Sequence, residues 1–253
     1  MNALVTPRIS IIMLAYQAAD TIIAAMEGAL SQSIPCEIIV SDDASADDTF
    51  NIAAKYAEHY VGVHTLSVRR NTSNLGLTKH FNTMMEISQG DVIVFMAGDD
   101  ISYPMRVAEI MQEFQNNANV FVLGSGWDEV DMQNHLIRHC GRNLPTKFSL
   151  QYFAKAGRMA TLVGATMAIR REVYSTFGPI QGMVEDNVMT LRGALLGGGS
   201  CLDSQLVRYR QNPNSLGHWL FARGDTSDQA FRKRYQRTIS MYLAIADDLE
   251  HCL

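Results

Sequence analysis

Two pairs of adjacent acidic residues follow short apolar segments in the first half of the chain. The pairs are Asp42 with Asp43 and Asp99 with Asp100. Adjacent like charges destabilise each other unless a cation or a hydrogen-bond donor compensates them. Carboxylate oxygens are also the ligands that hard divalent cations prefer. The two pairs therefore predict a binding site for a nucleotide together with a divalent metal ion.

A third acid pair, Glu185 and Asp186, lies in the second half of the chain. It follows the turn-like stretch 178–182 and precedes apolar residues at helical spacing, namely Val188, Leu191 and Leu195. This pattern predicts that the pair lies at a helix N-terminus, where the helix dipole keeps a carboxylate ionised. Two interpretations stay open, because such a pair either caps the helix or accepts a proton in a reaction.

The apolar pattern supplies the elements that must position these acids. Four short apolar runs are typical of strands buried in a parallel sheet: Ile9–Leu14, Cys36–Val40, Val63–Val68 and Asp91–Met96. Helical segments lie between and after them: about 20–32 with Asp20 as N-cap, about 48–60, 77–88, and a helix that Pro104 opens in its first turn. Strand–helix alternation with short connections predicts an α/β fold, a single Rossmann-like domain with a mostly parallel central sheet flanked by helices.

Ligands of open α/β sheets bind beyond the carboxyl ends of the strands. The first two acid pairs are predicted at two such ends. For Asp47 and Asp48 we favour helix capping, which Asp does well. For Asp99 and Asp100 we favour a ligand site, because a loop and Pro104 separate them from the next helix.

Composition excludes several classes of protein. Of the 253 residues 47% are hydrophobic, which excludes a disordered chain, and the net charge of −5 argues against nucleic acid as a partner. Four cysteines without C-x-x-C spacing are typical of reduced thiols in the cytoplasm. The run 9–15 lacks a preceding basic region, so we expect no signal peptide, and no run approaches the ~20 residues of a membrane span. We expect a cytoplasmic protein whose membrane contact, if any, is peripheral at the inner face.

Motifs in the first half resemble those of the family 2 glycosyltransferases, which have the GT-A fold. The resemblance covers about residues 8–110 and rests on segments in the family's order: Ser10–Gln17, Leu30–Ser33, Ile38–Thr49 ("VDDGSxDxT" in the family), Asn74–Gly76 with Asn82 and Gly90–Ile93, and Phe95–Asp100 ("FLDxDD"). In the second half, Val163–Arg171 is similar to "GxxxxfRR", Glu185 and Asp186 stand where the family has "ED" with Arg192 following, and Leu206–Arg210 is similar to "LvxYR".

The resemblance implies an inverting transfer of sugar from a nucleotide-diphosphate sugar to an acceptor hydroxyl. It implies that Asp99 and Asp100 hold Mn²⁺ or Mg²⁺, that Asp186 is the general base, and that Glu185 orients it or contacts the acceptor. For the nucleotide it implies contacts from Ala15 and Tyr16 at the first strand's end, from Asp42, Asp43 and Asp99, and from Lys79 and Arg210 at the diphosphate. The implied acceptor is a bacterial surface glycan or its lipid-linked precursor.

Two positions depart from the family pattern. Ala97 replaces the first acid of "DxDD", so only Asp99 and Asp100 remain there as metal ligands. Asn212 replaces the His that often follows "YR", and His218 is a candidate metal ligand in its place.

The remaining segments divide the chain by expected role. We expect residues 1–110 to bind the nucleotide sugar and about 111–225 to bind the acceptor, all in one domain. About 226–253 form an amphipathic helix, with Arg232–Arg234 and Arg237 before an apolar stripe of Ile239, Tyr242, Leu243 and Ile245. This helix either packs on its own domain or docks on an anionic membrane that presents a lipid-linked acceptor. The sequence leaves open whether the protein forms a homo-oligomer.

Other functions and sites fit the sequence less well. A non-catalytic nucleotide-sugar-binding or partner subunit is the main alternative, and Ala97 is the feature that favours it. A receiver-like domain of ~120 residues is too short, and a nucleotidyltransferase would bring a Gly-rich basic loop after the first strand. Gly197–Gly199 is expected to end a helix. His135 and His139 would share a helix face but lack a third metal ligand.

Overall fold

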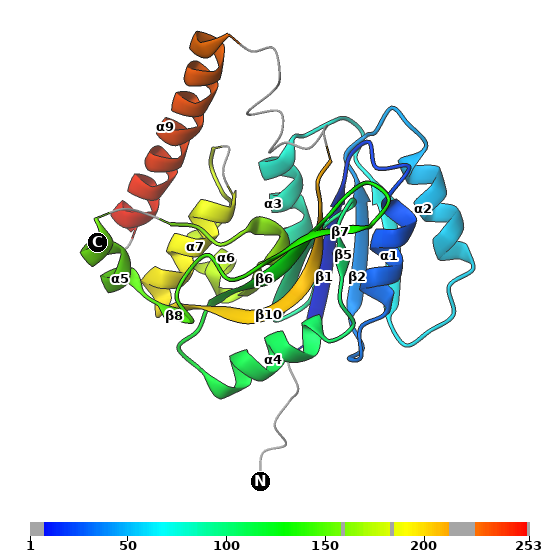
Figure 1. Ribbon diagram of the computed structural model, residues 1–253, viewed down its shortest axis with the longest axis horizontal. Coiled ribbons are helices and arrows are strands. Elements are labelled where there is room, and N and C mark those ends of the chain that lie inside the picture. The colour runs from blue at the N-terminus through cyan, green and yellow to red at the C-terminus, as the bar shows by residue number, and fades with distance from the viewer. Residues whose placement is uncertain (1–7, 158–159, 183–184, 213–225, 252–253) are drawn as a thin grey trace.

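The computed structural model describes residues 8–157, 160–182, 185–212 and 226–251. A large sheet forms the centre, with helices against both of its faces (Figure 1). The strands are β1 Ile9–Ala15, β2 Glu37–Asp42, β3 Thr65–Arg70, β4 Val92–Ala97, β5 Ile101–Ser102, β6 Val122–Val130, β7 Leu136–Cys140, β8 Lys147–Phe148, β9 Ala168–Arg170 and β10 Gly199–Arg210.

The helices fill the connections between the strands, as the sequence predicts for an α/β fold. They are α1 Ile22–Leu30, α2 Thr49–Glu58, α3 Leu77–Ile87, α4 Arg106–Asn116, α5 Leu150–Ala156, the short 3₁₀ helix η1 Gly164–Thr166, α6 Glu172–Phe177, α7 Glu185–Leu196 and α9 Ser227–His251. None of these helices is both long and apolar enough to cross a bilayer, within the part of the chain that the structure describes.

The sheet is mixed, but its long pairings are parallel. Its order is β3-β2-β1-β4-β9-β6-β10-β5, with β7 paired to β6 and β8 to β10. The pairs β1–β2, β1–β4, β2–β3 and β6–β10 are parallel. Short antiparallel β9 lies between β4 and β6 and so joins the parallel strands of the two halves into one sheet. This confirms the predicted α/β class with a mostly parallel sheet.

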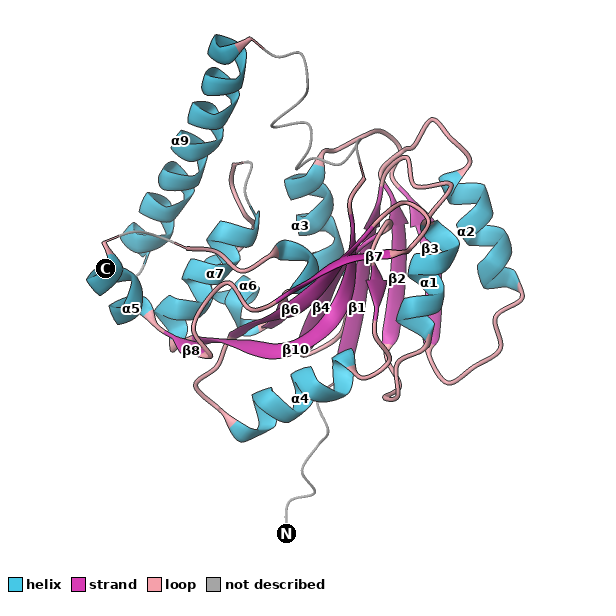
Figure 2. Cartoon of the chain, viewed as in Figure 1, coloured by secondary structure: helices cyan, strands magenta, loops and turns pink. Residues whose placement is uncertain are grey.

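Alternating side chains of the strands serve two separate cores, one on each face of the sheet. From β1, Ile11 and Met13 point to the core that α1, α2 and α4 cover, whereas Ile12 points to the core of α3, α6 and α7. Figure 2 shows these helices on the two sides of the sheet. Burial on both faces explains why β1 is almost continuously apolar in sequence.

Local expectations about helix starts and the two histidines were wrong in detail. Helix α1 begins after Thr21 as N-cap, not Asp20. Helix α4 begins after Met105, so Pro104 lies in the preceding turn and not in the first helical turn. His139 lies on strand β7 and His135 just before it, because this segment forms a hairpin with β6 and not a helix.

Helix α9 confirms the predicted C-terminal amphipathic helix and docks through a buried ion pair. Arg192 of α7 donates two hydrogen bonds of 2.8 Å to the carboxylate of Asp248, and both side chains are buried. The Arg192 guanidinium also donates to the carbonyl of Gly178 and lies over the Phe177 ring. This ion pair therefore helps to fix α9 to α7, beside the packing of Ala244 in the core.

Removing one partner of this ion pair should destabilise the protein strongly. Asp248→Ala leaves the Arg192 charge buried and uncompensated, and we expect the free energy of unfolding to fall by about 3–5 kcal/mol in urea denaturation. The control Arg232→Ala breaks an exposed pair with Asp228 on the same helix and should cost about 0.3–0.5 kcal/mol. Equal, small losses in both variants would contradict this role of Asp248.

Candidate functional site

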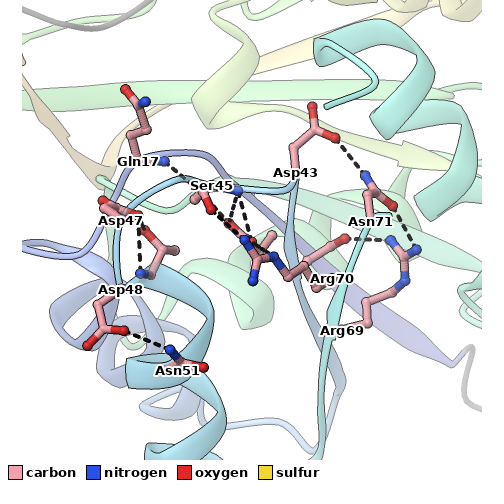
Figure 3. A network of polar contacts seen from close by, with 12 residues as sticks. Gln17, Asp43, Ser45, Asp47, Asp48, Asn51, Arg69, Arg70 and Asn71 are labelled. Carbon is pink, nitrogen blue, oxygen red and sulfur yellow. Dashed lines mark hydrogen bonds and ion pairs between the residues drawn. The ribbon is translucent and has the colours of Figure 1, made fainter. Parts of the chain in front are cut away.

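Asp42 organises the loop that follows β2. It is buried, it accepts hydrogen bonds from the backbone N–H and the hydroxyl of Ser45, and it pairs with Arg70 Nε at 3.1 Å. Ser45 in turn accepts from the backbone N–H of Gln17, which ties the loop after β1 to the loop after β2 (Figure 3). The carboxylate thus shapes the surface that two strand ends present.

Asp43 holds the loop after β3. Its carboxylate accepts from Asn71 Nδ2 at 2.7 Å and from the backbone N–H groups of Leu75 and Gly76 at 2.9 and 3.0 Å. Arg69 donates to the Asn71 side-chain oxygen from the other side (Figure 3). Both acids of the first pair therefore have partners in the protein, and their contacts with a nucleotide stay a prediction.

The other nucleotide candidates of the first half lie around the same strand ends. Ala15 is buried at the end of β1, where its carbonyl accepts the Asp43 backbone N–H at 2.9 Å. Tyr16, the next residue, is exposed, so its ring is accessible to a stacking partner. Lys79 is exposed on α3, one turn after Gly76. The structure brings Ala15 and Asp43 together directly.

Asp99 and Asp100 lie between β4 and β5 and place two carboxyl groups next to one another. Asp100 is 2% exposed, and its carboxylate accepts the Arg210 backbone N–H at 2.9 Å. Burial raises the pKa of both carboxyls, and the Asp99 charge raises the pKa of Asp100 further. Two adjacent groups of hard oxygen ligands fit a divalent cation, whose positive charge would favour the ionised form of both carboxyls.

Arg210 supports this acid pair from the end of β10. Its guanidinium donates to three backbone carbonyls, those of Asp99, Asp131 and Met132. These bonds hold the chain around Asp99 in place, and a contact of Arg210 with a diphosphate stays a prediction. Asn212, at the position of the family's His, donates to the Asp99 carboxylate at 3.3 Å.

A third protein ligand for a cation is not found among the described residues. No group of three or more His, Cys, Asp or Glu side chains gathers in that part of the chain. His218, predicted as a metal ligand, lies outside the described residues. Asp99 and Asp100 alone would hold the ion, with the remaining ligands from phosphate oxygens and water, as is usual for Mg²⁺.

Glu185 and Asp186 begin α7, as predicted, but their protonation differs from the prediction. Burial raises the pKa of both carboxyls; the Asp186 charge adds to this and brings the pKa of Glu185 to about 8. Arg237 of α9 lowers both pKa values in part. For Glu185 the expectation that the helix dipole keeps the acid ionised was wrong, because desolvation outweighs the dipole at this half-buried position.

A buried arginine and a 3₁₀ helix connect the two acid pairs. Arg106, fully buried, donates to the carbonyls of Phe95 in β4 and Ala165 in η1, and its positive charge lowers the pKa of Asp100. Next to Ala165, a Cβ on Gly164 would lie 3.6 Å from Asp186 Cβ. A short path through η1 therefore joins the two pairs, although about 85 residues separate them in sequence.

Tyr209 is a site residue that sequence reasoning did not single out. Burial raises the pKa of its hydroxyl to about 12, and the charges of Asp100, Asp99 and Asp186 contribute to this increase. The hydroxyl therefore stays protonated at neutral pH and keeps a hydrogen atom that it can donate. The feature of the sequence that could have pointed to Tyr209 is its place in the family-like segment Leu206–Arg210.

The comparisons with known proteins agree with this geometry. Residues 10–178 match the family described as glycosyl transferase family 2. The putative glycosyltransferase EpsE of Bacillus subtilis (strain 168) is 34% identical over 121 residues, which are 47% of this chain and 43% of that protein. The succinoglycan biosynthesis protein ExoU of Rhizobium meliloti (strain 1021) is 27% identical over 164 residues, 65% of this chain and 44% of ExoU. The chain thus spans less than half the length of these curated relatives.

Solved structures show the same fold. Staphylococcus aureus TarS 1–349, in complex with UDP-GlcNAc, has a similar structure with a TM-score of 0.67 at 16% sequence identity. The match covers 96% of this chain and 69% of the TarS chain. The mannosyltransferase PcManGT from Pyrobaculum calidifontis, in complex with GDP-Man and Mn²⁺, has a TM-score of 0.61 at 14% identity and covers 98% and 74%. This likeness establishes the predicted GT-A-type fold.

The raised pKa of Glu185 should be visible in the pH dependence of stability. Between about pH 4.5 and 8 the folded state binds this proton and the unfolded state does not, so the free energy of unfolding falls as the pH rises. Glu185→Gln removes that loss. We expect the variant's stability relative to wild type to increase across this window in urea denaturation.

The matched control is Glu58→Gln, at an exposed position that ends α2. A Glu185→Gln stability difference that stays constant across the window would show that burial does not raise the pKa of this carboxyl.

Proposed function

The chain belongs to glycosyl transferase family 2, and we propose that it is an inverting transferase. It would move a sugar from a nucleotide-diphosphate sugar to an acceptor hydroxyl. One observation carries this proposal: two carboxyl pairs from opposite halves of the chain approach one another through η1, with the Tyr209 hydroxyl in the field of both. Such a site would have carboxylates for the metal ion of the leaving diphosphate on one side and a proton acceptor on the other.

Asp99 and Asp100 would hold Mn²⁺ or Mg²⁺. When bound, the ion supplies Lewis-acid stabilisation of the negative charge that develops on the diphosphate. The raised pKa values of these two carboxyls support the assignment, since burial disfavours their ionised forms and a bound cation would offset that cost. Arg210 keeps the Asp99 backbone in place through its bond to that residue's carbonyl.

The nucleotide would lie over the ends of β1 and β2. Tyr16 offers an exposed ring for the base, and Lys79 an exposed ammonium group for the diphosphate. Asp42 and Asp43 keep the loops around this surface in place through the bonds to Ser45 and Asn71. We therefore propose a supporting role for the first acid pair beside its direct contact with ribose or base.

Asp186 would accept the acceptor's proton. As the acceptor oxygen bonds to the anomeric carbon, the bond from that carbon to the diphosphate oxygen breaks and the diphosphate leaves with the electron pair. The hydroxyl proton passes to the Asp186 carboxylate. A raised pKa makes Asp186 a stronger base than an exposed carboxylate, provided the pH keeps it ionised. Glu185, whose pKa is about 8, would hold its proton at neutral pH and orient Asp186 or the acceptor.

The acceptor we propose is a growing surface polysaccharide or its lipid-linked precursor. ExoU, the relative with 27% identity, is a succinoglycan biosynthesis protein. The proposed setting is the cytoplasm, at the inner face of the membrane. A second candidate function, a non-catalytic nucleotide-sugar-binding subunit, is favoured only by Ala97 in place of the family's acid.

A change that keeps the side chain's shape but removes its charge tests the cofactor assignment at the metal pair. Asp100→Asn keeps an oxygen that can accept the Arg210 N–H but removes a negative charge, so we expect the gain in donor affinity from Mn²⁺ to fall at least about tenfold. Calorimetric titration of UDP- and GDP-sugars with and without Mn²⁺ measures this gain. The control is Asp91→Asn, an exposed acid just before the opposite end of β4.

If Mn²⁺ still increases donor affinity to the same extent in Asp100→Asn, the metal assignment is wrong. Donor binding without any hydrolysis or transfer by the wild-type protein would favour the non-catalytic subunit.

Removing the base should separate binding from chemistry. Asp186→Asn preserves an acceptor for the Asn187 N–H, and we expect unchanged donor affinity with transfer slowed about 10²–10⁴-fold. Donor titration and a transfer assay measure the two quantities. The control Asp203→Asn changes an exposed acid of β10. Normal transfer by Asp186→Asn together with loss in Glu185→Gln would exchange the two roles, and normal transfer by both would place the base elsewhere.

A further inference from the structure

Helix α9 uses only one of its faces to pack on the domain. Ala244, Ile245 and Asp248 are buried, and Asp248 forms the ion pair with Arg192. The opposite face carries large apolar side chains that stay exposed: Ile239 is 47% exposed, Tyr242 56%, Leu243 66% and Leu249 40%. A contiguous apolar stripe on a long helix marks an interaction surface.

The spacing of this stripe is that of a helix–helix seam. Ile239, Tyr242, Ala246 and Leu249 are three, four and three residues apart. This 3.5-residue period keeps one line of side chains facing a partner helix over several turns. Helix α9 has 25 residues, so it is about 37 Å long, and its N-terminal end projects away from the sheet (Figure 1).

The charges along α9 identify the partner. The first half carries Arg232 and Lys233, with Asp228 already paired to Arg232, whereas Asp247 and Glu250 lie in the second half. An anionic membrane would attract the first half but repel the acids beside Leu243 and Leu249. A second α9 in antiparallel orientation places each basic half along an acidic half.

We propose that α9 is a dimerisation element, which pairs antiparallel with α9 of a second copy of this chain. A two-fold axis near residue 241 sets Ile239 of each copy against Tyr242 of the other and Arg232 against Glu250. The interface is self-complementary and closed, so it yields a dimer and not a filament.

A groove beside the seam offers further room for the partner. It has a volume of about 530 Å³ and is lined by Ile239, Leu243 and Ala244 of α9 and by Gln181 and Gly182. Gly182 lies close against Ser240, since a Cβ on it would be 2.5 Å from Ser240 Oγ. Pairing therefore adds contacts beside the segment that leads to Glu185. The inference does not depend on the proposed transfer reaction.

Charge exchange tests the proposed orientation in analytical ultracentrifugation. Arg232→Glu and Glu250→Arg each place like charges opposite one another at two symmetric points, and we expect each to raise the dimer dissociation constant about tenfold at low salt. The double variant restores opposite charges and should return the constant to that of wild type. Tyr242→Glu puts a charge at the centre of the seam and should yield monomers, while the control Val61→Glu, at an exposed apolar residue far from α9 in sequence, should not.

Circular dichroism checks that each variant is folded, and the charge exchange keeps the test decisive if Tyr242→Glu does not fold. A wild-type protein that stays monomeric up to about 100 µM overturns the proposal. Monomers that co-sediment with anionic vesicles would make the stripe a membrane surface instead. Single charge variants that dimerise as tightly as wild type would exclude the antiparallel orientation.

Discussion

A single buried cation, the guanidinium of Arg106, joins the parts of this protein on which the site depends. It donates to the Ser102 hydroxyl in β5, to the carbonyl of Phe95 in β4 and to the carbonyl of Ala165 in η1. Burial lowers the pKa of Arg106 to about 10, so it still carries its charge at neutral pH. Because a buried charge is costly unless it is compensated, these acceptors and the nearby Asp100 must keep their places around it.

The two acid pairs of the site have raised pKa values for a common reason. Each consists of adjacent carboxyls that the fold withdraws from water, Asp99 with Asp100 beside β10 and Glu185 with Asp186 beside η1. In the function we propose, the first pair holds a cation and the second pair takes part in acid–base chemistry. Desolvation would serve both roles, because it favours a bound cation at one pair and raises the basicity of the other.

Arginines hold the outer parts of the structure in a similar way. Arg210 fixes the backbone around Asp99, and Arg192 fixes α9 through Asp248. Because α9 also carries Arg237, whose charge acts on Glu185 and Asp186, the position of this helix influences the candidate base. Attachment of α9, its exposed seam and the protonation of the second acid pair are thus physically linked.

The sequence by itself determined the strands β1 to β4, the helices between and directly after them, and the strand ends at which Asp42, Asp43, Asp99 and Asp100 stand. Burial on both faces leaves continuous apolar runs, and short connections bring acids to strand ends. The sequence failed at the starts of α1 and α4 and at the β6–β7 hairpin, where local preferences are weak compared with packing. Only the tertiary structure decided that Arg210 bonds to backbone carbonyls, that charges of both acid pairs act on Tyr209 and that the pKa of Glu185 is raised to about 8. These properties depend on desolvation by segments distant in sequence, which no local pattern encodes.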